Sequence, residues 1–487
     1  MTALADELRR SAIHGVLRRV REEGIDTLRL AWCDLHGTMR GKTLVCADEA
    51  ALADTLAGGV GLVSTILMKD SSDRTAFKVF EPGAASALPG LPAGAANLLL
   101  RPDPASFTVL PWAPRTGWLR GEVLLDDGSP VEADPRRVLQ RAVLALQQRG
   151  LQLRCGLEVE FHVYRIVDDG LAPEAAAWPA EPPQLRLLHP GYNLLAEGWA
   201  DLADEALAIV RRTALGLGMP LRSLEIELGP SQFEAVFAPT DALAAADQLA
   251  LFRSAVRQAL RRAGYHASFV CKPPLPQAIA SGWHLHQSLV DDSGRNVMRR
   301  EGAAGSGARA VLSDTGAMWL AGLLAHARGM AALCAPTIPA YARFQGSVMA
   351  PQAARWGRDN RGAMLRVLGR PGDAGTRIEN RLGEPMANPY LYLAAQVFAG
   401  LDGVNRGLDP GPASDSPYAT DPADPAAALP TSLSEALDAL AEDPVLQHGL
   451  GPAMAQLFDT VKRQELARCA AAQDTQQWER REYFSRF

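Results

Sequence analysis

The run Cys155-Gly-Leu-Glu-Val-Glu-Phe-His-Val-Tyr164 decides how this chain is interpreted, because polar and apolar side chains alternate along it. A period of two is typical of a β-strand, in which successive side chains point to opposite faces. Glu158 and Glu160 therefore share one face of the predicted strand. Two carboxylates this close together need either a cation between them or solvent around them, and for an isolated strand a solvated face is the commoner explanation.

Other stretches carry the same kinds of side chain and favour the cation. They are Glu227 and Glu234 on either side of a Gly-Pro turn, His284 and His286 two residues apart, and Glu379 between Arg377 and Arg381. Carboxylate oxygens with an imidazole suit Mg²⁺ or Mn²⁺, and the six cysteines form no CxxC pair for a thiolate zinc site. The sequence therefore predicts a site for hard divalent cations.

Arginines are dense in the same half of the chain: Arg343, Arg355, Arg358, Arg361 and Arg366. A surface salt bridge is the commoner role for any one of them. Guanidinium groups also match phosphate oxygens, so arginines together with a cation site indicate phosphoryl transfer. The chain has neither a GxxxxGK[ST] loop nor a GxGxxG turn after a predicted strand, which means that another kind of ATP-binding fold is needed.

Composition narrows the class of protein. Among 487 residues, 49 Lys and Arg against 55 Asp and Glu give a net charge of −6, which argues against a nucleic-acid partner. Hydrophobic residues make up 47%, as in a globular protein, but no apolar run is long enough for a membrane span. The acidic N-terminus does not resemble an export signal, and scattered cysteines suit reduced thiols, so we expect a cytoplasmic protein.

Periodicity predicts an α+β fold. The predicted helices span residues 4–22, 135–149, 203–217, 241–263, 314–333, 388–404 and 431–474. The predicted strands are a hairpin over 28–45 and the runs 153–164, 224–228, 233–237 and 266–272. Pro, Gly and Ala crowd two expected loops, 167–191 and 406–430, and a stretch before Trp112 where we place a boundary between domains 1–112 and 113–487.

The order and spacing of these motifs resemble the glutamine synthetase family, in its bacterial class I-like branch. The matching segments are 34–42, 156–161, 227–234, 269–273, 281–288, 336–343, 360–366, 377–381 and 387–391. The resemblance implies a small N-terminal β-grasp-like domain and a large catalytic domain built on a curved antiparallel sheet with helices. It also implies a homo-oligomer of two stacked hexameric rings, a dodecamer, that uses ATP and two or three Mg²⁺ or Mn²⁺ ions at sites between neighbouring subunits.

The resemblance assigns roles residue by residue. One divalent ion is expected on Glu160, Glu227 and Glu234, and a second on Glu158, His284 and Glu379. Nucleotide and phosphate contacts are expected from His286, Ser288, Arg361, Arg366 and Arg377. Glutamate is expected to bind Arg343 and Arg381, with Tyr192 beside the nitrogen nucleophile. Arg361, Glu227 and Arg343 are the expected catalytic groups.

Three departures from the family pattern concern the nitrogen nucleophile and glutamate. Met349 stands where glutamine synthetases carry a glutamate that helps to deprotonate ammonium, and Val63 aligns with their ammonium-binding aspartate. Ile279-Ala280 replaces an Asn-Gly contact to glutamate, whereas Tyr192 is retained. A thioether accepts no proton, and apolar groups favour a nucleophile with a carbon body. Tyr418, where some relatives are adenylylated, lacks the usual flanking pattern and is interpreted as an ordinary loop residue.

These departures favour a ligase that resembles the γ-glutamyl-amine ligase subgroup: glutamate takes phosphate from ATP, and an amine attacks the γ-glutamyl phosphate. An alkylamine with a pKa near that of Lys, about 10.4, would need a base such as Glu227, whereas an aromatic amine is already neutral at pH 7. Two alternatives stay open. One is glutamine synthetase itself, with ammonium as the substrate, and the other is a catalytically silent nitrogen sensor or scaffold.

Overall fold

A five-stranded sheet forms the N-terminal part of the fold, with the strand order β2-β1-β5-β4-β3. Its elements are α1 Ala3–Glu22, β1 Thr27–Cys33, β2 Met39–Val45, α2 Glu49–Gly58, β3 Val60–Val63, β4 Asn97–Val109 and β5 Thr116–Leu124. The computed structural model describes residues 3–82, 86–302, 305–345, 349–414 and 427–487, so Tyr418 lies outside the described residues. The predicted first helix and hairpin are confirmed, with β1 and β2 antiparallel.

Strand β4 lies in the Gly-, Pro- and Ala-rich stretch in which we placed a domain boundary. It pairs with β5, which begins at Thr116 and also pairs in parallel with β1. The N-terminal sheet therefore extends beyond residue 112, to Leu124. The division of the chain into domains at that residue stays a prediction.

A second, nine-stranded sheet follows, with the order β12-β13-β14-β11-β6-β9-β8 and with β7 and β10 paired to β6. Its strands are β6 Leu151–Asp168, β7 Gln184–Leu187, β8 Leu221–Ile226, β9 Gln232–Asp241, β10 Tyr265–Ser268, β11 Trp283–Asp291, β12 Trp356–Arg358, β13 Leu365–Leu368 and β14 Arg377–Gly383. All pairs are antiparallel except β12 with β13. The predicted α+β class is confirmed, and β7 corrects the expectation of a plain loop over 167–191.

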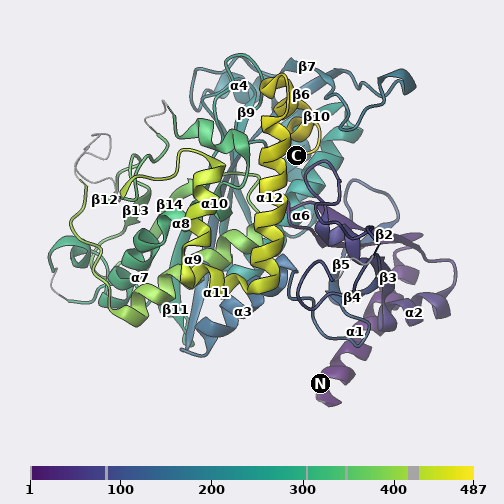
Figure 1. The fold of residues 1–487 in the computed structure, drawn as a ribbon, viewed down its shortest axis with the longest axis horizontal. Coiled ribbons are helices and arrows are strands. Elements are labelled where there is room, and N and C mark those ends of the chain that lie inside the picture. Colours follow the sequence, from purple (N-terminus) through teal and green to yellow (C-terminus); the bar gives the residue numbers. More distant parts are fainter. Residues whose placement is uncertain (1–2, 83–85, 303–304, 346–348, 415–426) are drawn as a thin grey trace.

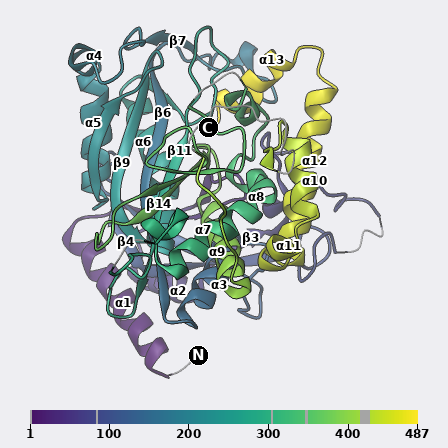
Figure 2. The ribbon, with the colours of Figure 1, turned by 90° about the vertical axis from the view of Figure 1, so that its left-hand side faces the viewer.

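Helices cover this sheet and connect it to the N-terminal part (Figure 1). They are α3 Pro135–Gln147, α4 Glu197–Leu202, α5 Asp204–Gly216, α6 Ala242–Arg262, α7 Asp314–Ala325, α8 Ala327–Cys334, α9 Pro389–Arg406, α10 Leu433–Ala441, α11 Pro444–Leu450, α12 Pro452–Ala470 and α13 Thr475–Glu479. Helices α5 and α6 run beside β9 and β6 (Figure 2), and Phe161 of β6 packs edge-on against Phe252 of α6 at 6.2 Å. Helix α12 reaches the N-terminal part, where Arg468 pairs with Asp70 at 2.8 Å.

Two of the predicted helices are divided in the structure. The helix expected over 314–333 bends by 75° between α7 and α8, at His326. The helix expected over 431–474 is three helices, because Pro444 and Pro452 each start a new one. Proline lacks the N–H that would continue the preceding helix, so these breaks are local.

Within the described residues, no single helix is long and apolar enough to cross a bilayer. The α7–α8 pair passes that test only when its two bent halves are taken together, and most of its side chains are buried in the protein core.

Candidate active site

Strand pairing brings the predicted acidic and imidazole side chains together on one face of the nine-stranded sheet. The central strand β6 places Glu158 opposite His284 of β11 and Glu160 opposite Glu234 of β9. One strand further, His286 of β11 lies opposite Glu379 of β14. Because side chains alternate along a strand, this face is the reverse of the one that Phe161 presents to α6.

The side chains of this cluster are within reach of a common cation. His284 lies 3.5 Å from Glu158 and 3.9 Å from both Glu160 and Glu234. Three groups bring their ligand atoms within 4.8 Å of one another: Glu160 with Glu227 and Glu234, Glu158 with Glu234 and His284, and Glu158 with His286 and Glu379. The first group is the ligand set expected for one ion.

The second expected set is distributed differently. Glu379 groups with His286 rather than with His284, and Glu158 belongs to both remaining groups. His286 Nε2 lies 2.8 Å from Glu158 Oε1, so the imidazole expected to contact nucleotide shares a carboxylate with the cation cluster. The assignment of individual ligands stays a prediction.

The electrostatics of the cluster fit a divalent cation. Burial, and then the charges of Glu160 and Glu158, raise the pKa of Glu234 to about 10. Burial, and then the charge of Glu227, raise the pKa of Glu160 to about 7. Burial alone would also raise the pKa of Glu158, but His284 and His286 hold it below its usual value. Carboxylates that repel one another in this way form the oxygen-rich donor set that Mg²⁺ or Mn²⁺ takes.

Two residues that the sequence did not single out hold Glu160 in place. The Gly282 N–H donates to Glu160 Oε2 at 2.8 Å, and Gln232 Nε2 donates to the same oxygen at 3.2 Å. A Cβ atom on Gly282 would lie 2.6 Å from Arg343 Nη2 and 2.9 Å from His284 Nε2, so a side chain there would displace one of these two groups. Both residues lie in the quoted motifs, but only the fold shows which carboxylate they contact.

The arginines gather on the β13–β14 side of the cluster. Arg381 Nη1 and Arg366 Nη1 donate to the two oxygens of Glu379 at 2.5 and 3.0 Å. Arg377 Nε donates to His286 Nδ1 at 3.1 Å, which leaves the Nε2–H of His286 to donate to Glu158. Burial would raise the pKa of Glu379, but the charges of His284 and Arg381 keep it low.

Arg343 is buried, and its guanidinium donates to the backbone carbonyls of Arg381 and Gly383, each at 3.1 Å. Ser288 lies two residues beyond His286 on β11, and its side chain forms no hydrogen bond with any described residue. Arg361 is exposed and likewise forms no hydrogen bond or salt bridge with any described residue, so its role stays a prediction.

The residues expected around the nitrogen nucleophile are exposed. Met349 is 47% exposed, and Val63, 42% exposed, lies on β3 in the other sheet. Tyr192 is 53% exposed, its N–H donates to Leu228 O at 2.7 Å, and its hydroxyl donates to Gln277 O at 2.8 Å. Tyr192 therefore lies beside the turn that follows Glu227.

Backbone strain is concentrated at this turn. Four non-glycine residues around it, Tyr192, Leu195, Ser231 and Gln277, have φ between 56° and 62°. Such conformations cost of order 1–3 kcal/mol each and are frequent at ligand-binding sites. Ile279 also packs here, since a Cβ atom on Gly229 would lie 2.9 Å from it. The strained segment is therefore a candidate binding wall next to the acidic cluster.

An α+β fold whose antiparallel sheet carries carboxylates and imidazoles opposite arginines has the parts of an enzyme that handles phosphate groups with divalent cations. Comparison with known proteins defines the class further. The catalytic domain of glutamine synthetase matches residues 132–483, which is more than half of the chain. The chain belongs to the glutamine synthetase family, and it is a ligase of that family.

Two curated relatives and one solved structure illustrate the similarity. A gamma-glutamylanilide synthase from Acinetobacter sp is 36% identical over 98% of this chain and 96% of its own length. A glutamine synthetase from Halobacterium salinarum is 30% identical over 97% of this chain and 96% of its own length. The structure described as apo GmaS without ligand is 29% identical, covers 96% of this chain and 98% of its own, and has a TM-score of 0.75.

Proposed function

We propose that this protein joins glutamate to an amine with a substantial carbon body, at the expense of ATP. The γ-carboxylate of glutamate attacks the γ-phosphate of ATP, ADP leaves, and the amine nitrogen displaces phosphate from the γ-glutamyl phosphate. The products are a γ-glutamyl amide, ADP and phosphate. Assembly into two hexameric rings and a cytoplasmic location stay predictions.

The observation that carries this proposal is the apolar surface beside the acidic cluster. Glu227 is followed directly by Leu228, which the backbone of Tyr192 contacts, and Leu195 N donates to Ile226 O at 3.1 Å. The side chains of this surface, Tyr192, Leu194, Leu195 and Leu228, are 42% to 61% exposed. Exposed leucines around a polar site favour the hydrocarbon part of a ligand over a bare ammonium ion. The similarity to a gamma-glutamylanilide synthase supports an aromatic amine.

The donor set of the cluster fits two or three Mg²⁺ or Mn²⁺ ions. We propose Glu160, Glu227 and Glu234 for one ion, and Glu158 with Glu379 and the two histidines for the others. Bound ions of this kind polarise phosphate oxygens and neutralise the charge that develops during phosphoryl transfer.

Other side chains orient the ion ligands, bind the substrates and accept a proton. Gln232 and Gly282 orient Glu160, and Arg366 and Arg381 fix Glu379. We assign the carboxylates of glutamate to Arg343 and Arg381, and the phosphate oxygens to Arg361, Arg366 and Arg377, whose guanidinium groups match such oxygens. Glu227, whose pKa is raised by burial, can take a proton from an attacking amine.

The test is phosphate release from ATP with Mg²⁺ and glutamate, with ammonium compared against aniline, isopropylamine and putrescine at equal concentrations. We expect turnover with aniline or isopropylamine to exceed turnover with ammonium by at least tenfold, about 1.4 kcal/mol in the barrier. Met349→Glu should shift the preference towards ammonium, and Met349→Leu is the matched control. Ammonium-dominated turnover in the wild type would identify a glutamine synthetase, and no turnover with any nitrogen donor would favour a silent protein.

A further inference from the structure

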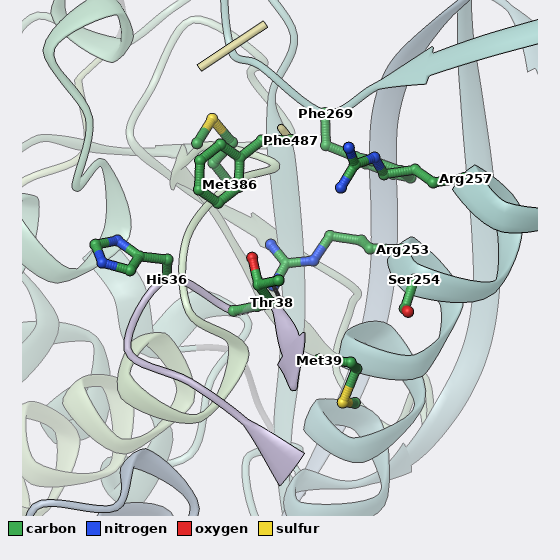
Figure 3. Close-up of a pocket in the computed structure, with 10 residues that line it drawn as sticks. His36, Thr38, Met39, Arg253, Ser254, Arg257, Phe269, Met386 and Phe487 are labelled. Atoms are coloured by element: carbon green, nitrogen blue, oxygen red, sulfur yellow. Dashed lines mark hydrogen bonds between the residues drawn. The ribbon is translucent and has the colours of Figure 1, made fainter. Parts of the chain in front are cut away.

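A small cavity, whose lining residues are drawn in Figure 3, lies away from the acidic cluster. It is about 40 Å³ in volume and lies between the turn after β1, helix α6 and the C-terminal residue Phe487. Phe269 also lines it and stacks on Phe161 at 5.3 Å, on the face of β6 that turns away from Glu160. The proposed chemistry does not use this cavity.

Two guanidinium groups point into the cavity from successive turns of α6 (Figure 3). Arg253 donates to the carbonyls of Pro385 at 2.6 Å, Ala387 at 2.9 Å and Gly37 at 3.1 Å. Arg257 donates one bond within the described residues, to Ser485 O at 3.4 Å. Neither arginine has a carboxylate within 4.0 Å in the described part of the chain. A guanidinium has five N–H donors. Most of those on Arg257 therefore have no protein acceptor within the described residues.

The nearest acids are engaged elsewhere. Asp34 accepts from its own turn, from the N–H groups of His36 at 3.0 Å and Thr38 at 2.9 Å, and from Arg40 at 2.5 Å. Glu384 accepts from the Thr337 hydroxyl at 2.8 Å. Neither carboxylate forms a hydrogen bond with Arg253 or Arg257 in the described residues, so their charges offset those of the two arginines only in part.

The cavity has an excess of positive charge. Burial, and then the charges of Arg253 and Arg486, lower the pKa of Arg257 to about 10. Burial also lowers the pKa of Arg253, and the charge of Asp34 only partly opposes this. Carbonyl dipoles alone do not neutralise the buried Arg253, and Arg257 is partly buried beside it, so an anion between them would offset part of the cost of burying this charge.

We propose that this cavity binds one small anion, of the size of chloride, between Arg253 and Arg257. A volume of 40 Å³ is room for about three waters, which suits a monatomic anion better than a nucleotide or an amino acid. The anion would tie the turn after β1 to α6. That turn approaches closely, because a Cβ atom on Gly37 would lie 2.0 Å from Arg253 Nη2, and Gly37 has a φ of 75°.

A bromide soak of crystals of the full-length protein tests the site directly. We expect an anomalous peak within hydrogen-bonding reach, about 3.5 Å, of both guanidinium groups, and no peak there in Arg257→Gln. The matched control is Arg261→Gln, which removes the same charge from an exposed position one turn along α6 and should keep the peak. The absence of bromide from the wild-type cavity would overturn the proposal.

A solution measurement on the intact protein complements the crystals. At equal ionic strength, about 0.15 M, the unfolding temperature of the wild type should be higher by a few degrees in chloride than in gluconate, which is too large to enter. Arg257→Gln should lose this difference and Arg261→Gln should retain it. Formate in place of chloride distinguishes a carboxylate from a halide as the preferred occupant. Equal responses of both variants would show a general salt effect and contradict the site.

Discussion

The cluster at His326 and the candidate active site both combine histidine with largely buried carboxylates, and their environments shift the histidine pKa in opposite directions. His326, at the bend between α7 and α8, lies between Asp443 at 2.7 Å and Asp402 at 2.9 Å. Burial lowers its pKa, but hydrogen bonds to both aspartates outweigh this and raise it above its usual value. In the candidate active site, burial and then the charge of Arg381 lower the pKa of His284 to about 4.

This difference in histidine pKa reflects the charge balance of each cluster, and the charge balance indicates the role of the cluster. At the helix bend, one imidazolium is matched by two acids, and Arg406 neutralises part of the remaining charge. In the active site, carboxylates outnumber imidazoles, and the arginines lie on one side only. A cluster that is balanced by its own residues stabilises the fold, whereas an unbalanced one needs a ligand.

Glu234→Gln is expected to have the largest effect among the variants that test this difference between the two clusters. Removing a carboxylate from the cation cluster should lower turnover about 1000-fold, or about 4 kcal/mol in the barrier, because the cluster would then hold less tightly the divalent cation that neutralises phosphate charge. Without divalent ions, the same variant should unfold at an equal or higher temperature at neutral pH, since Gln needs no proton on folding whereas the buried Glu234, with its pKa raised to about 10, does. Phosphate release measures the loss of turnover, and calorimetry in EDTA measures the unfolding temperature.

The matched control for that variant is Glu225→Gln. Glu225 lies directly opposite Glu234 on β8, accepts from the Ser223 hydroxyl at 2.8 Å and belongs to no candidate cation group in the described residues. It should keep most of the activity. Full activity in Glu234→Gln would refute the assignment of the cluster.

The next largest effect is expected from His326→Leu. Two largely buried aspartates would lose their shared partner, and the free energy of unfolding should fall by about 2–3 kcal/mol. Chemical denaturation measures this loss, while activity per folded molecule should not change. Arg406→Gln, which removes a mostly exposed partner of the same Asp402, should cost less than about 0.5 kcal/mol. Equal losses in the two variants would mean that the His326 cluster is not balanced as described.

Divalent ions should distinguish the two clusters through a smaller effect, a gain in the free energy of unfolding. Mg²⁺ or Mn²⁺ at about 100 times its dissociation constant should stabilise the wild type by about 2.7 kcal/mol, because it binds only the folded cluster. We expect His326→Leu to keep this increment and Glu234→Gln to lose most of it. Thermal unfolding with and without EDTA measures both, and an increment that is equal in the two variants would place the ion elsewhere.

The smallest effect is a difference in pH dependence. Folded Glu160 and Glu234 have pKa values raised to about 7 and about 10, so in EDTA the folded state holds protons that the unfolded state releases above about pH 4.5. Stability should therefore fall as pH rises through this window. The contribution of His326 is fully present below about pH 6.5 and is lost as pH rises through its raised folded pKa.

Variants separate these two contributions. Above pH 7, Glu234→Gln should show a flatter decline than the wild type, while His326→Leu should retain the part that comes from the carboxylates. Urea unfolding across pH 5 to 9 in EDTA measures the slopes. A wild-type stability that rises with pH in EDTA would contradict the raised carboxylate pKa values.

Local patterns predicted the elements that depend on their own residues. The first helix, the hairpin of β1 and β2 and the long strand around Glu158 follow from amphipathic periodicity and from turn residues such as Gly37. The bend at His326 was not predicted, and the groups that His326 contacts there are two aspartates 76 and 117 residues further along the chain, which no local pattern indicates. The breaks at Pro444 and Pro452 were visible in the sequence, but a continuous apolar pattern concealed them.

The same division holds in the candidate site. Residue types, order and spacing were enough to name the carboxylates and the family, because a strand places Glu158 and Glu160 on one face by its geometry alone. Which side chains share a cation depends on the register between β6, β9, β11 and β14, and so does the grouping of Glu379 with His286. The support of Glu160 by Gln232 and Gly282 depends on the same pairing.

The sequence by itself determined the α+β class and the chemistry of the donor atoms, since these depend only on which residues are present and how they alternate; the roles of Met349 and Val63 stay predictions from the family resemblance. The tertiary structure decided the cross-strand register, the strained turn beside Tyr192, the division of two helices and the pairing of arginines in a cavity without acids. Each of these arises from contacts between residues far apart in the chain, whose geometry no local pattern contains.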